Sequence, residues 1–87
     1  MSPVDLTCSE RDELNVAIEE GVGEATAEDA RDVWVDEPLP SGEPEIARER
    51  ANEVEWIYIA DGEATGAVTV RLQSWGLWHL ESIVRCV

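Results

Sequence analysis

The chain has 87 residues and a mass of 9.6 kDa, a size that supports one folded domain and excludes an enzyme built from several domains. Twenty Asp and Glu residues stand against six Arg, no Lys and one His, which gives a formal net charge of -14. Leu, Ile and Val account for 21 residues, and four Trp add apolar area. We therefore expect a folded domain rather than a disordered chain.

The loss of Lys is selective, because Arg is retained. At molar salt the Debye length shrinks to about 3 Å, and the self-repulsion of an acidic surface is mostly screened. The composition resembles that of cytosolic proteins from salt-accumulating halophilic archaea, and it predicts adaptation to high salt. The alternative is an ordinary acidic protein that binds a basic surface.

The sequence also bears on location. It contains no run of about 18 apolar residues that would span a membrane. Its start, residues 1–5, lacks the basic and apolar regions of a signal peptide. We therefore expect a cytoplasmic protein without membrane contact. Cys8 and Cys86 are too few for a disulfide framework, and in a reducing cytosol they are expected to be thiols.

Charge and apolar residues are segregated along the single domain, residues 1–87. Residues 1–55 contain 17 acidic residues and 4 Arg, whereas residues 56–87 contain 3 acidic residues and 2 Arg. This pattern predicts an acidic helical half over about 1–53 and an apolar β-meander over about 54–86, and the second half is expected to supply most of the core.

The N-terminal half carries helix signals. Thr7 and Glu10 have the spacing of a capping box, and apolar residues then recur at helical spacing until Gly21, which predicts a helix over about 9–20. Thr26 begins a second candidate helix, although residues 27–36 could equally end in a short strand at 33–35. A short third helix is predicted over 45–52, after a proline-rich loop.

From residue 54 the apolar period changes to two. Strands are predicted at 54–60, 67–73 and 77–86, joined by an Asp61-Gly62 turn and a turn near 74–76. The predicted fold class is α+β, with one or two N-terminal helices packed on a C-terminal three-stranded antiparallel β-meander.

Alternation sorts the predicted meander into two faces. The face assigned to the core contains Ile57, Ile59, Val68, Val70, Leu72, Trp78, Leu80 and Val84. The opposite face mixes aromatic, charged and aliphatic side chains, and its interface candidates are Trp56, Tyr58, Arg71, Leu77, His79, Ile83 and Arg85. This mixture is typical of binding hot spots. The alternative is that a helix or the loop over 37–45 covers the same face.

These features favour a non-enzymatic protein-interaction or regulatory module. Self-association through the sheet, as a homodimer, needs the fewest further assumptions, and another protein is the other expected partner. Nucleic-acid binding is the alternative, with Trp56 and Tyr58 stacking on single-stranded bases beside Arg71. The net charge opposes that alternative, because it repels phosphate.

Candidate chemistry is sparse. His79 and Glu81 share a predicted face, but Ser82 points to the other face and leaves this pair without a nucleophile. Cys8, His79 and Cys86 lack the paired spacing that fixes metal ligands. We therefore expect no catalytic residue, no metal site and no cofactor.

Overall fold

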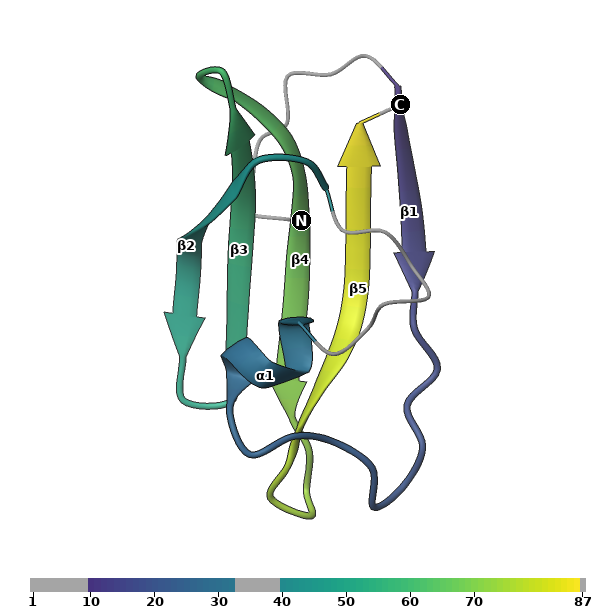
Figure 1. Cartoon of the computed structure of the whole chain (residues 1–87). Helices are drawn as coiled ribbons and strands as arrows, with labels where there is room; N and C mark the ends of the chain where they lie inside the picture. The colour runs from purple at the N-terminus through teal and green to yellow at the C-terminus, as the bar shows by residue number, and fades with distance from the viewer. Residues whose placement is uncertain (1–9, 33–39, 87) are drawn as a thin grey trace.

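The computed structural model describes residues 10–32 and 40–86, and within them five strands form one antiparallel sheet. The elements in chain order are β1 (Arg11–Asn15), α1 (Ala27–Asp32), β2 (Glu43–Arg50), β3 (Glu53–Ala60), β4 (Glu63–Leu72) and β5 (Trp78–Cys86). The strand order is β1-β5-β4-β3-β2, and the short helix α1 packs on β4 and β5 (Figure 1). No helix in these two ranges has the length and hydropathy of a membrane span.

The predicted α+β class is wrong, because the protein is mostly β. The segment predicted as a helix over 9–20 contains β1, which pairs with β5, and the segment predicted as a helix over 45–52 lies largely within β2, which pairs with β3. Both segments are rich in residues that favour helices locally, and pairing with a distant strand overrides that preference. The two strands lie at the two edges of the sheet.

The three strands predicted from alternation are present as β3, β4 and β5, and they form the centre of the sheet. The turn at Asp61-Gly62 connects β3 to β4 with Ala60 opposite Glu63, so its loop has two residues. Asp61 and Gly62 both have positive φ, 53° and 79°, as the tight hairpin turn requires.

Three register shifts interrupt the ladders, and each inserts one residue. The extra residues are Ala47 in β2, Thr65 in β4 and Glu81 in β5. Past such a bulge the inward and outward positions of a strand exchange relative to its partner. The Thr65 side chain also holds its bulge in place, because its hydroxyl donates to the carbonyl oxygen of Ser41 and lies 3.3 Å from that of Tyr58.

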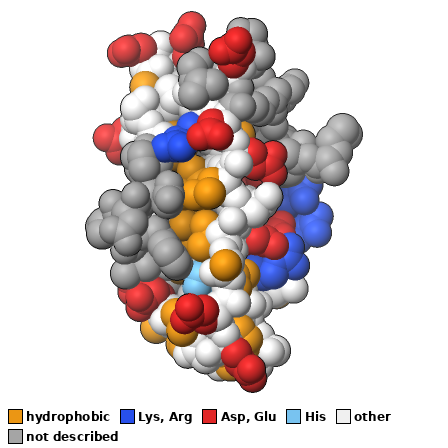
Figure 2. Space-filling view, turned by 90° about the vertical axis from the view of Figure 1, so that its right-hand side faces the viewer, with side chains coloured by type: hydrophobic (Ala, Val, Ile, Leu, Met, Phe, Trp, Pro, Cys, Tyr) orange, Lys and Arg blue, Asp and Glu red, His pale blue; other side chains and the backbone are white. Residues whose placement is uncertain are grey.

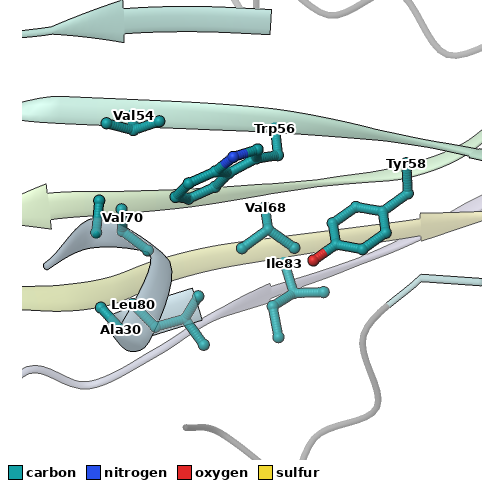
Figure 3. Close-up of a cluster of buried hydrophobic side chains, with 9 residues drawn as sticks. Ala30, Val54, Trp56, Tyr58, Val68, Val70, Leu80 and Ile83 are labelled. Carbon is teal, nitrogen blue, oxygen red and sulfur yellow. The ribbon is translucent and has the colours of Figure 1, made fainter. Parts of the chain in front are cut away.

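The bulges explain why the predicted faces are partly wrong. The Thr65 bulge places Trp56 opposite Val68, where an uninterrupted ladder would place Glu55, which is on the same face as Ile57. The Glu81 bulge likewise brings Ile83 opposite Val68. The core side chains therefore project from the face of the sheet that α1 covers, here called the α1 face (Figure 3). Its buried hydrophobic residues are Ala27, Ala30, Val54, Trp56, Tyr58, Val68, Val70, Leu80 and Ile83.

The helix begins as predicted from Thr26, whose hydroxyl oxygen accepts a hydrogen bond from the Asp29 N–H at 3.1 Å. Ala27 and Ala30 are buried against the sheet. Their small side chains let the helix backbone approach the strands closely. The alternative strand at 33–35 lies outside the described residues.

Candidate interaction surface

The interface candidates on β3 and β5 are mostly part of the core. Trp56, Tyr58 and Ile83 are 2%, 3% and 1% exposed, and they lie beneath α1 or beside the other buried residues of the α1 face. His79 is 3% exposed, and its Nδ1 lies 2.8 Å from the carbonyl oxygen of Leu80. These four side chains are not displayed to a partner.

Arg31 connects the helix to the core. Its guanidinium lies 4.8 Å from the centre of the Trp56 ring, and Nε and Nη2 form hydrogen bonds of 2.8 and 3.1 Å with the carboxylate of Asp32. These hydrogen bonds hold the pKa of the Asp32 carboxyl below its ordinary value. The arrangement therefore fixes Arg31 over the indole ring and explains why this basic residue is not a free surface charge.

The opposite face of the sheet, here called the far face, has a charged end and an apolar end. At the charged end Arg71 connects three strands, since its Nη2 lies 2.6 Å from the Glu53 carboxylate and its Nε lies 3.2 Å from that of Glu81. Thr69 donates to the Glu55 carboxylate at 3.2 Å. The interface candidate Arg71 therefore belongs to a network within the chain.

The apolar end of the far face is a small cluster. Ala67 is buried there, and Ile57, Ala64 and Val84 pack against it. Ile57 and Val84 were assigned to the main core from the sequence, so the two bulges move both residues to this smaller cluster.

The remaining candidates lie near the ends of β5. Arg85 is paired with Asp12 of β1, with Nη2 2.8 Å from the carboxylate. Leu77 is half-buried and its carbonyl oxygen accepts from the Gln73 N–H, which closes the connection between β4 and β5. In the view of the β1 side of the molecule, the basic side chains lie beside acidic ones (Figure 2).

The cysteine prediction is wrong at one position. Cys86 is disulfide-bonded, so it does not carry a free thiol. The other cysteine of the chain, Cys8, lies outside the described residues. The cysteines therefore give no support to the expected reducing compartment. Within residues 10–32 and 40–86, the structure contains no group of three His, Cys, Asp or Glu side chains that could hold a metal ion.

An exposed apolar side chain lies on a strand that the sequence did not indicate as an interaction surface. Strand β2 is an edge of the sheet, and six of its eight residues are exposed. Ile46 at its centre is 55% exposed, which is unusual for a large apolar side chain in this molecule. An edge strand also presents unpaired backbone groups to any partner. We call the exposed strand Glu43–Arg50 the β2 edge.

The β2 edge carries charged side chains without an ion pair in the described residues. Glu43 and Glu45 precede Ile46, and Arg48 and Arg50 follow it. Within the described part of the chain none of these four side chains forms an ion pair. This contrasts with Arg31, whose guanidinium is bound to a neighbouring carboxylate. The β2 edge thus combines an exposed apolar centre with available charges of both signs.

Comparisons of the chain with protein-family models, curated proteins and solved structures found no match.

Proposed function

We propose that the protein is a non-enzymatic protein-interaction module that binds its partner through the β2 edge. The observation that carries the proposal is Ile46, which is 55% exposed at the centre of an edge strand, whereas every other large hydrophobic side chain described in the sheet is at least partly buried. An apolar residue in the middle of a polar rim is the arrangement found at binding hot spots.

The edge position supports this proposal independently of the side chains. A strand at the edge of a sheet can accept an additional strand from another protein, with backbone hydrogen bonds supplying affinity and side chains supplying specificity. The adjoining far face is occupied by its own ion pairs around Arg71, so it offers a partner fewer free groups than the β2 edge does.

The residues that suggested nucleic-acid binding are buried or already held in ion pairs. Trp56 and Tyr58 are buried and cannot stack on a base. Arg71 is held between two carboxylates, which compete with a phosphate for the same guanidinium. We therefore do not propose this function further.

A photoreactive amino acid at position 46 tests the proposal. After irradiation in an extract of the source cells at native salt, we expect a discrete adduct of this variant. The matched control carries the same amino acid at position 22, because Val22 is also exposed, at 45%, but lies in the loop before α1. Equal labelling from both positions, or no adduct from position 46, would contradict an interaction at the β2 edge.

A further inference from the structure

Four of the five charged residues of the β2 edge are arranged in two blocks, and the fifth, Glu49, lies opposite Val54 and so on the α1 face. Glu43 and Glu45 lie at the beginning of the strand, whereas Arg48 and Arg50 lie at its end. When two such strands run antiparallel with their centres aligned, Glu43 faces Arg50 of the second copy. In the same alignment Glu45 faces Arg48 of the second copy. A two-fold axis generates each contact twice, since such an interface uses the same patch on both subunits.

The bulge at Ala47 places these charges on one face. Side chains directly opposite each other in an antiparallel pair share a face. Glu45 lies opposite Ile57 and Arg48 lies opposite Glu55, and these two β3 residues are two positions apart on the far face. In a regular strand, residues three apart point to opposite faces. The inserted Ala47 cancels that difference, so Glu45 and Arg48 both lie on the far face.

The same reasoning applies to the outer charges. Glu43 lies opposite Ile59 and Arg50 lies opposite Glu53, and both β3 partners belong to the same alternating series. All four charged side chains of the pattern therefore project to the far face. Opposite charges then meet across the two-fold axis on one face, which a strand without the bulge would not allow.

We propose that two copies of this chain associate through antiparallel β2 edges, with the two-fold axis between Ile46 and Ala47. The proposal rests on the proposed function and names its partner as a second copy. In this register each exposed Ile46 lies beside the axis, opposite Ala47 of the second copy. Pro44 has no N–H to donate, so the backbone ladder between the two copies is incomplete and the ion pairs set the register.

Reversing the charges of the β2 edge in pairs tests this register. One variant combines Glu43→Arg with Glu45→Arg, and a second combines Arg48→Glu with Arg50→Glu. In each variant alone, like charges face each other across the axis. In an equimolar mixture, the first variant presents four Arg side chains to four Glu side chains of the second. Association should therefore be lost in each variant and restored in the mixture.

The measurement is sedimentation equilibrium at about 0.5 M KCl, where the Debye length lies between about 3 and 8 Å and the global repulsion is screened more than close contacts are. We expect the wild-type chain to dimerise reversibly below roughly millimolar concentration. Each variant alone should raise the dissociation constant about tenfold or more, as the reversal of several exposed ion pairs implies. A labelled component identifies the mixed dimer.

A matched control carries Glu19→Arg and Glu20→Arg, two exposed residues of the loop after β1. It makes the same change in net charge as Glu43→Arg with Glu45→Arg, and it should not weaken association. Circular dichroism and thermal melting check the fold of every variant. The variant with Arg48→Glu and Arg50→Glu places carboxylates opposite Glu53 and Glu55 of its own β3, which could prevent folding. In the variant with Glu43→Arg and Glu45→Arg, the new side chains lie opposite Ile57 and Ile59, so this variant decides the test if the other does not fold.

A wild-type chain that stays monomeric up to millimolar concentration overturns the proposal. The charges of β2 would then be explained as protection of an exposed edge strand against unwanted pairing. A dimer that is unaffected by Glu43→Arg with Glu45→Arg also overturns it. The photoreactive variant separates the two proposals. An adduct at position 46 of twice the chain mass supports a second copy, whereas an adduct of another mass supports an interaction at the β2 edge and rejects the second copy.

Discussion

The phenol of Tyr58 lies in the apolar layer of the α1 face. Its oxygen is buried and has no hydrogen-bond partner in the described residues. Burial raises the pKa of Tyr58 above its ordinary value of about 10, because the tyrosinate would lose its hydration. The nearby Arg31 opposes this effect but does not cancel it. The neutral phenol is thus the form compatible with the folded core.

This pKa difference predicts how stability depends on alkaline pH. The unfolded chain releases the Tyr58 proton near pH 10, whereas the folded chain releases it only at a higher pH. The contribution of Tyr58 to the free energy of unfolding is therefore complete below about pH 10 and is lost as the pH rises further. We expect the free energy of unfolding to fall above that pH. The chain has one Tyr and no Lys, so tyrosinate absorbance follows this residue alone and few other groups titrate there.

Denaturant unfolding across this pH range provides the measurement, and Tyr58→Phe is its control. The variant should retain the stability of the wild-type chain at neutral pH, since the hydroxyl it removes has no hydrogen-bond partner among the described residues, and it should lose less stability at high pH. An equal alkaline loss in both proteins would show that Tyr58 is not the group responsible.

Single residues also show why the core could be predicted only in part. The run Trp56-Ile57-Tyr58-Ile59 is apolar on both faces, so alternation alone does not say which pair points toward α1. The choice depends on the bulge at Thr65, which shifts the register between β3 and β4. No propensity marks Thr65 as an inserted residue, whereas Val68 and Val70 were assigned correctly because Thr69 and Arg71 make their strand amphipathic.

At the level of elements, the central and edge strands differ in how much local sequence reveals. The strands β3, β4 and β5 have period-two patterns and tight turns, which are local signals. The edge strands β1 and β2 have few apolar residues, because edges face solvent on one side and must resist unwanted pairing. Their Glu, Arg, Leu and Ala residues satisfy helix spacing equally well, so only pairing with β5 and β3 identifies them as strands.

The hairpin between β3 and β4 allows a direct test of turn geometry. Gly62 has a φ of 79°, a conformation that costs a residue with a side chain about 1 to 2 kcal/mol. We expect Gly62→Ala to lower the free energy of unfolding by about that amount, as measured by denaturant titration. An added methyl meets no atom within 4 Å, so the loss would come from the backbone alone.

Asp61→Asn is the matched control for this turn. Asp61 also has a positive φ, of 53°, and Asn tolerates this region at least as well as Asp does. The control should therefore keep the stability of the wild-type chain. A Gly62→Ala variant as stable as the wild type would show that the turn is not held in this conformation.

The net charge is a property of the whole molecule. The shortest dimension of the protein is 22 Å, which is below the Debye length of about 30 Å at 0.01 M salt. At low salt the excess of acidic residues therefore causes net repulsion across most of the molecule, whereas at 1 M salt only neighbours within about 3 Å interact strongly. With a formal charge of -14, this repulsion opposes the folded state mainly at low ionic strength.

Thermal melts in KCl measure this effect. Between about 0.01 and 1 M KCl we expect the free energy of unfolding to rise by at least about 1 kcal/mol, which for a domain of this size raises the melting temperature by roughly 4 to 8 °C. A further rise between about 1 and 3 M would indicate cation and water binding by carboxylates in addition to screening. Equal melting temperatures throughout would refute the predicted adaptation to salt.

The candidate interaction surface could be predicted only in part, because it depends on strand pairing as well as on the residue pattern of the segment itself. The order of charges from Glu43 to Arg50 is visible in the sequence, but these charges can face a second copy in this order only if the segment is an edge strand. A helix over the same residues would distribute these charges around its axis. The bulge at Ala47, which brings both blocks to one face, arises from pairing with β3 and is not marked by any turn residue.

The pairing of β1 with β5 has a consequence for synthesis on the ribosome. Strands β2 to β5 pair with their neighbours in chain order, so each hairpin can close soon after its second strand emerges. Strand β1 emerges before all of them, yet its partners, from Ser82 to Cys86, come last. Strand β1 must therefore wait without its partner until β5 has been synthesised, and its charged residues favour solubility during that time.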